Sequence, residues 1–124
     1  MATITAEIEV SNIEQVKAEA KDRLMVALEA IGMQAENYAK LNLETPKKHA
    51  DGTIRPNVDT GRLVNSITHQ QEDETTVAVG TNVEYAAYVE MGTSKSDAYP
   101  YLEPAITEHL DEYKEIAEQY LQTE

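Results

Sequence analysis

The sequence predicts an α+β fold, in which a small, mainly antiparallel sheet packs on a long N-terminal helix and a C-terminal helix completes the layer. Two observations lead to this prediction. Residues 2–10 alternate apolar and polar side chains, and residues 75–80 are rich in β-branched side chains, as strands are. Between these segments and again near the C-terminus, apolar residues recur every three or four positions, as on the buried face of a helix.

The first strand is expected at residues 2–10 and a long helix after it. Ser11 and Glu14 form a capping-box pattern, and the apolar period then continues until residues 41–43. Such a helix would be roughly 40 Å long at 1.5 Å per residue. Gly32 lies in its middle, where glycine costs about 1 kcal/mol, and therefore indicates a bend or a close contact.

Residues 44–58, ETPKKHADGTIRPNV, are expected to form a long exposed loop. They contain two prolines and no period of either helix or strand, and Asp51-Gly52 favours a turn. Three interpretations stay open: disorder in a free subunit, a solvated loop, and a basic patch that meets the acidic half of a neighbouring subunit. The basic residues of that patch are Lys47, Lys48 and Arg55.

A β-hairpin is expected in the middle of the chain. Residues 59–64 begin with the N-cap types Asp and Thr and favour a short turn of helix. Strands at residues 65–71 and 75–80 then flank the acidic tip Glu72-Asp73-Glu74. The first strand of the protein is expected to pair with this hairpin, because a lone strand leaves its backbone groups unsatisfied.

Another short helix is expected to follow the hairpin. Asn82 can cap it, and Gly92 ends it, because glycine accepts a left-handed conformation. Within this helix Tyr85 and Tyr88 would share a face with Val89 and pack inward together.

The last helix is expected to run from Leu102 to Leu121, with Pro104 in its first turn and the extended segment 99–101 before it. Its outer face is acidic. The predicted buried stripe comprises Leu102, Ile106, Leu110, Tyr113, Ile116, Ala117, Tyr120 and Leu121.

The composition indicates a single domain spanning residues 1–124. The chain has no cysteine, which excludes disulfides and thiolate metal sites. It has no apolar run of about 18 residues and no basic segment followed by an apolar block at the start. These features predict neither a membrane span nor a signal peptide, so we expect the protein to be used in a cytosol or built into a particle there.

The net charge of −13 is unevenly distributed. Residues 1–58 carry 7 basic and 9 acidic residues, a net charge of −2, whereas residues 59–124 carry 3 and 14, a net charge of −11. Such an acidic surface repels phosphate backbones and disfavours sequence-specific binding to nucleic acid. Solubility is one interpretation of this charge, and a surface that lines a DNA passage is another.

No pattern of residues indicates catalysis or cofactor binding. His49, His69 and His109 are scattered, without metal-ligand spacing, and we expect His69 to be a surface or edge residue of the hairpin. The chain contains neither a nucleophile-elbow motif nor a phosphate-binding loop. We therefore expect no enzyme, no cofactor and no metal.

Three blocks of sequence carry a resemblance to a known family. VDTGRLVNSI at residues 58–67, VGTNVEYAAYVEMGTSK at 79–95 and YPYLEPAI at 99–106 occur in this order. Together they are similar to the small neck or tail-component proteins of long-tailed, lambdoid-type double-stranded DNA bacteriophages. The chain departs from the family at Ala87, where proline is frequent, and near Tyr101 and Glu103, where the family has phenylalanine and a basic residue.

The resemblance implies a structural virion-morphogenesis protein at the head–tail junction (neck) or in tail completion. Its implied partners are other head–tail connector or tail proteins, with a homo-oligomeric ring in the particle and assembly in the bacterial host cytoplasm. A tail terminator ring is the alternative within the virion. An acidic DNA mimic that inhibits a host nucleic-acid enzyme is the alternative of another class, followed by a small hydrolase.

Six residues are predicted to make assembly contacts. Five lie within or beside the loops at residues 44–58 and 91–100, and the sixth, Arg62, lies in the first block that carries the family resemblance. An intramolecular ion pair of Arg62 with Glu84 or Glu90 is the alternative to a subunit contact at that position. For Tyr99 and Tyr101 the alternative is a place in the core or at its edge. The six predicted contact residues are Lys47, Lys48, Arg55, Arg62, Tyr99 and Tyr101.

Overall fold

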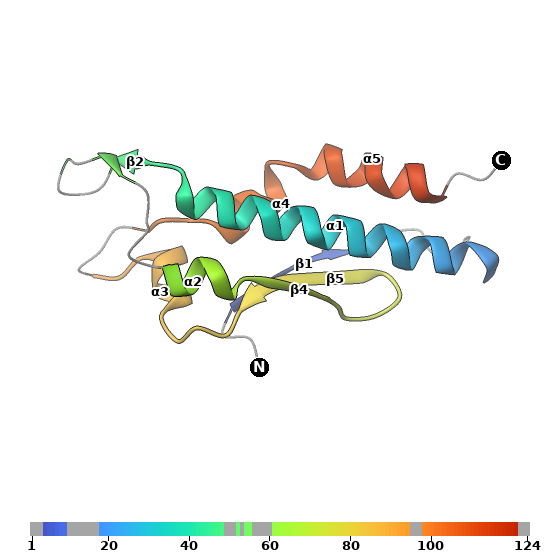
Figure 1. The fold of residues 1–124 in the computed structure, drawn as a ribbon, viewed down its shortest axis with the longest axis horizontal. Helices are drawn as coiled ribbons and strands as arrows, with labels where there is room; N and C mark the ends of the chain where they lie inside the picture. The colour runs from blue at the N-terminus through green and yellow to red at the C-terminus, as the bar shows by residue number, and fades with distance from the viewer. Residues whose placement is uncertain are drawn as a thin grey trace.

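Helices cover one face of a three-stranded antiparallel sheet in the computed structural model, which confirms the predicted α+β class (Figure 1). The structure describes residues 4–9, 18–48, 52, 54–55, 61–94 and 98–121. The strands are β1 (Ile4–Glu9), β2 (Lys47–Lys48), β3 (Ile54–Arg55), β4 (Thr68–Gln71) and β5 (Thr76–Thr81). The helices are α1 (Ala18–Glu44), α2 (Gly61–Ser66), α3 (Ala86–Met91), α4 (Leu102–Thr107) and α5 (Leu110–Leu121).

The sheet has the strand order β1-β5-β4, so the second strand of the hairpin lies in the centre. Its residues are buried from Thr76 to Thr81, and it pairs with β1 over its whole length, with Ile4 opposite Thr81. The pairing of the N-terminal strand with the hairpin is thereby confirmed. The strand predicted at 65–71 is shorter than expected, because Ser66 is the last residue of α2 and its hydroxyl donates a hydrogen bond to the Leu63 carbonyl.

Helix α1 is the central element of the layer above the sheet. It packs against β4 and β5 on one side and against α4 and α5 on another, and α5 runs antiparallel beside it (Figure 1). Its end at Glu44 agrees with the prediction, whereas the predicted capping box at Ser11 lies outside the described residues. Gly32 marks a close contact, because a Cβ there would lie 2.7 Å from Cγ2 of Val77.

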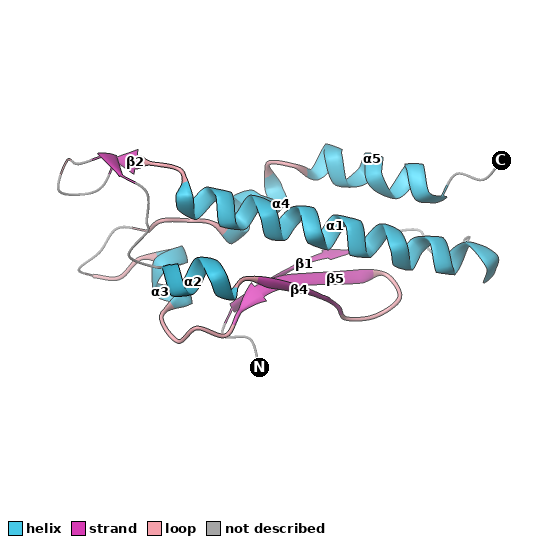
Figure 2. Ribbon diagram, in the orientation of Figure 1, coloured by secondary structure: helices cyan, strands magenta, loops and turns pink. Residues whose placement is uncertain are grey.

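The segment predicted as one loop at 44–58 contains a small antiparallel ribbon. Lys47 pairs with Arg55 and Lys48 with Ile54, and Figure 2 shows this ribbon beyond the C-terminal end of α1. Gly52 lies between the two strands with φ of 89°, a conformation that suits glycine and agrees with the predicted turn. Sequence periodicity missed the ribbon because strands of two residues are too short to show a period.

Helix α3 begins later than predicted, at Ala86, so Asn82 does not cap it. Tyr85 therefore precedes the helix, and Tyr88 does not share an inward face with it: Tyr88 is 64% exposed, which corrects the prediction for this residue. Tyr85 and Val89 do pack against the core. Gly92 ends the helix as predicted, with φ of 78°.

The single C-terminal helix predicted from Leu102 is two helices. The chain turns at Glu108 and His109, where the N–H of Glu108 still bonds to the carbonyl of Pro104, in the first turn of α4. This turn shifts the helical phase, and Leu110, predicted to be buried, is 55% exposed. No helix among the described residues is both long enough and apolar enough to cross a membrane.

The hydrophobic core lies between α1, the sheet and α4. Tyr101 is its largest fully buried side chain, with no exposed surface. Its other largest members come from α1, α2 and β5 and from Ile67, which directly precedes β4. They are Leu24, Leu28, Ile31, Leu43, Leu63, Ile67, Val77 and Val79.

Candidate assembly surface

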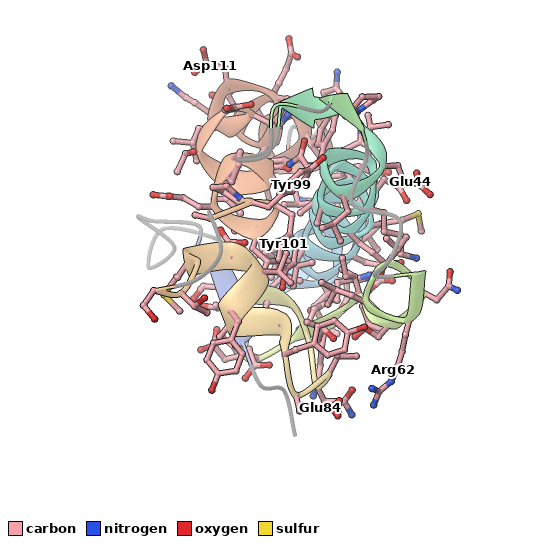
Figure 3. The ribbon with its side chains drawn as sticks, turned by 90° about the vertical axis from the view of Figure 1, so that its left-hand side faces the viewer. Glu44, Arg62, Glu84, Tyr99, Tyr101 and Asp111 are labelled. Carbon is pink, nitrogen blue, oxygen red and sulfur yellow. The ribbon has the colours of Figure 1, made fainter. Side chains whose placement is uncertain are left out.

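An exposed ion pair joins α2 to the turn that precedes α3. The guanidinium of Arg62 lies 2.8 Å and 3.2 Å from the two carboxylate oxygens of Glu84, and the two side chains point toward one another (Figure 3). This hydrogen-bonded pairing raises the pKa of Arg62 and lowers the pKa of Glu84. The intramolecular pair considered for Arg62 is therefore present, with Glu84 as the partner.

Helix α3, which follows this turn, presents apolar side chains to solvent. Met91 of α3 is 67% exposed and Tyr88 almost as much, and the Arg62 guanidinium carbon lies 5.9 Å above the ring centre of Tyr85. Tyrosine, methionine and arginine are the residue types that protein–protein interfaces favour. We call the set Arg62, Glu84, Tyr85, Tyr88 and Met91 the α2–α3 surface.

Glu90 has a different role from the one considered in the sequence. Its carboxylate accepts hydrogen bonds from the backbone N–H groups of Tyr101 at 2.9 Å, Leu102 at 2.8 Å and Glu103 at 3.1 Å. These groups form the first turn of α4, whose N–H groups have no partner within the helix. Glu90 thus caps α4 from α3 and closes the loop between them, a contact with no local sign in the sequence.

Tyr99 and Tyr101 anchor that loop from inside the protein. The hydroxyl of Tyr101 donates to the carbonyl of Ala86 at 3.0 Å, and burial raises the pKa of this phenol. The hydroxyl of Tyr99 donates to the carbonyl of Thr45 at 2.6 Å, and its N–H donates to the carbonyl of Val89 at 2.7 Å. Both side chains lie in the interior in Figure 3, as core residues.

The burial of Tyr99 and Tyr101 corrects their predicted role as assembly contacts. With relative exposures of 6% and 0%, neither ring is accessible to a partner protein. The two aromatic rings of the motif YPYLEPAI belong to the hydrophobic core. The alternative interpretation, core residues, is the one that the structure supports.

The three basic residues Lys47, Lys48 and Arg55 lie on the ribbon formed by β2 and β3. The backbone places them together, since Lys47 is directly opposite Arg55. Their side chains lie outside the described part of the protein, so their contact role stays a prediction.

Two polar clusters on α1 were not predicted. In one, the ring of His69 on the edge strand β4 lies between Glu29 and Glu36, at 2.8 Å and 2.7 Å. His69 is thus an edge residue, as expected, but it faces a helix and not solvent. The sequence gives no indication of this cluster, because 33 residues separate His69 from its nearer partner.

The second cluster fastens α5 to α1. Glu112 accepts hydrogen bonds from the hydroxyl of Tyr38 at 2.5 Å and from the amide of Gln34 at 2.8 Å. The first of these bonds contributes most to lowering the pKa of Glu112, and it raises the pKa of Tyr38. The ring of His109 stacks on the ring of Tyr38 with centres 3.5 Å apart, so this cluster packs α5 and the turn before it against α1.

Within the described part of the chain, no group of three or more His, Cys, Asp or Glu side chains has the arrangement of a metal site. The polar clusters above join helices and strands.

Comparison with known proteins identifies the family. Residues 10–92 match the family model described as "Bacteriophage HK97-gp10, putative tail-component". The match includes the block at 58–67 and most of the block at 79–95, whereas the block at 99–106 lies beyond it. Neither the curated proteins nor the solved structures give a match. Because the family model covers well over half of its length, this chain belongs to the HK97-gp10-like family of bacteriophage tail components.

Proposed function

We propose that this tail component acts at the head–tail junction or in tail completion, as a structural protein that assembles into or onto a ring. The observation that carries the proposal is the family match over residues 10–92. A tail component belongs to the virion and works in contact with other structural proteins of the particle. Assembly in the host cytoplasm, a position at the neck and the absence of a catalytic role are parts of the proposal.

Two surfaces on opposite sides of the protein support assembly in a ring. The Arg62–Glu84 pair of the α2–α3 surface and Asp111 on the outer face of α5 lie on opposite sides in Figure 3. A ring forms when one surface of a subunit binds a different surface of its neighbour and the rotation closes. A protein with two such surfaces can contact a neighbour on each side.

Charge supports a second contact. The outer side of the C-terminal helices exposes Glu108, Asp111, Glu115 and Glu118. The ribbon carries Lys47, Lys48 and Arg55. We propose that the basic ribbon of one subunit meets an acidic surface of the next, since opposite charges guide association and fix its orientation.

Deletion of the gene in its phage or prophage tests the proposed position. We expect negative-stain electron micrographs of the lysate to show full heads separate from finished tails, with infectivity restored by a plasmid copy. Tails of abnormal length would instead favour a tail terminator. Normal infectious particles would contradict both, and recovery of a host nuclease or polymerase with the protein would then favour the DNA-mimic inhibitor.

Substitutions on the α2–α3 surface test the contact itself. The double variant Tyr88→Ser, Met91→Ser should leave the fold intact, because exposed substitutions rarely change stability by more than about 0.5 kcal/mol. We expect it to fail in plasmid complementation of the deletion. Met33→Ser is the matched control, since Met33 is also about half exposed but lies on α1, outside both proposed contact surfaces. Full complementation by the double variant would exclude this surface.

A further inference from the structure

The ring of His69 fills a socket on α1. The socket consists of Glu29, Gly32 and Glu36, which lie along one side of the helix over two turns. Nδ1 of His69 lies 2.7 Å from Glu36, and Nε2 lies 2.8 Å from Glu29. Gly32 forms the floor, because a Cβ there would lie 2.8 Å from the imidazole Cδ2. The histidine side chain is 15% exposed, so the ring is largely enclosed.

This geometry requires a proton on both ring nitrogens. A carboxylate only accepts hydrogen bonds, and neutral imidazole has one N–H and one lone pair. A neutral ring would therefore hold a lone pair against one of the two carboxylates at less than 3 Å. The doubly protonated ring donates to both carboxylates and also offsets their mutual repulsion.

The other neighbours of the ring come from α1 and from the sheet. On α1, the ammonium of Lys40 lies 3.0 Å from the second oxygen of Glu36 and holds that carboxylate. On the sheet, the buried Val77 also faces Gly32, since its Cγ2 would lie 2.7 Å from a Cβ there. The amide of Gln71, two residues along β4, donates to the carbonyl of Met25 at 2.9 Å. Among the described residues, the charged groups that face the cluster are thus Glu29, Glu36 and Lys40, all from α1.

We propose that His69 is a proton-operated clasp, which holds the edge strand β4 on α1 while its ring is doubly protonated and loosens this seam when the ring loses a proton. The strand β4 lies at the edge of the sheet, so β5 alone holds it within the sheet. Its attachment to the helix layer depends on the side chains that reach α1, and among the four residues of β4 His69 is the one that carries charge.

The direction of the effect follows from two opposing influences on the pKa of His69. Burial lowers the pKa of His69, but the hydrogen bonds to Glu29 and Glu36 outweigh it and raise the pKa above the ordinary 6.5. The clasp is therefore fully closed between pH 4.5, above which the Glu36 carboxylate is charged, and pH 6.5, and it opens as the pH rises through the raised pKa of His69. Glu36 shows the reciprocal effect, since the bonds from His69 and Lys40 outweigh burial and lower its pKa.

NMR titration of the imidazole signals of the full chain tests the clasp, with His69→Gln identifying the signal. We expect His69 to titrate above 6.5, and Glu29→Gln and Glu36→Gln each to move its midpoint downward. Glu44→Gln is the matched control, because Glu44 is an exposed glutamate at the C-terminal end of the same helix, and it should leave the midpoint in place. A midpoint at or below 6.5, or one that ignores both substitutions in the socket, would overturn the proposal.

Amide hydrogen exchange supplies the readout that a merely structural histidine would not change. As His69 deprotonates, the protection factors of the β4 amides should fall several-fold relative to those of β5 amides bonded to β1. The same change should be absent in His69→Gln, which has no proton to lose. Protection factors of β4 that stay constant through the titration would show that no clasp opens.

Discussion

Replacing Gly32 by alanine sets two effects of known size against each other. In an exposed helix, alanine in place of glycine stabilises by about 1 kcal/mol, because the unfolded chain loses less freedom on folding. At this position, however, the new methyl group would lie 2.7 Å from Cγ2 of Val77 and 2.8 Å from Cδ2 of His69. Both distances are well below the contact distance of two carbon atoms.

Neither neighbour can move away at low cost. Val77 is a buried β-branched residue of the central strand, and both nitrogens of the His69 ring are held by carboxylates. Extra methyl groups in a packed site cost about 1–3 kcal/mol, and here the displaced ring also weakens two charged hydrogen bonds. The cost of the steric contact therefore exceeds the gain in helix propensity. We expect Gly32→Ala to lower the free energy of unfolding by about 1–2 kcal/mol.

Urea unfolding followed by circular dichroism measures the effect. Gly61→Ala is the matched control, because a Cβ at Gly61 would meet nothing within 4 Å at the start of α2. The control should be neutral or stabilising by up to about 1 kcal/mol. A Gly32→Ala protein that is as stable as the wild type or more so would refute the close packing of β4 and β5 on α1.

Three further predictions concern single contacts. Glu90→Gln should lower the free energy of unfolding by about 1 kcal/mol, because a neutral amide caps α4 less well than a carboxylate that accepts three N–H bonds. In urea unfolding, this loss should become smaller at high salt. Tyr101→Phe should cost about 1–2 kcal/mol in the same assay, because the buried Ala86 carbonyl loses its donor; an unchanged midpoint would mean that this carbonyl finds another partner. Because the pKa of Glu36 is lowered, the stabilisation by this carboxylate is present above pH 4.5 and is lost as the pH falls through its folded pKa. Thermal unfolding should therefore show a steeper loss of stability on acidification for the wild type than for Glu36→Gln, and parallel curves would contradict the bonding of Glu36 to His69.

The elements that could be predicted from the sequence are those with a long regular period. Helix α1 buries one face and strand β5 buries both, so their side-chain spacing records their structure, and strand β1 coincides with a segment of alternating spacing. The ribbon at residues 47–55 and the break at His109 were missed for the opposite reason. A two-residue strand has no period, and a turn between two helices can leave the apolar spacing almost unchanged.

The contacts that join elements were much harder to predict. The Arg62–Glu84 pair was one of two alternatives, and the structure shows that the other candidate, Glu90, caps α4. Nothing local in the sequence indicates that His69 meets α1, since this contact depends on the register of the hairpin and the phase of the helix. For Tyr88, a start of α3 only a few residues later than predicted was enough to turn the ring toward solvent.

The central claim, a structural role at the head–tail junction, is tested most directly by locating the protein in purified particles. An epitope tag would be placed at the C-terminus of a functional copy, and gold-labelled antibody would be viewed on intact virions and on separated heads and tails. Our account predicts gold at the neck or at the head-proximal end of the tail, in every particle. Infectious particles without the protein, or gold distributed along the tail shaft, would contradict it.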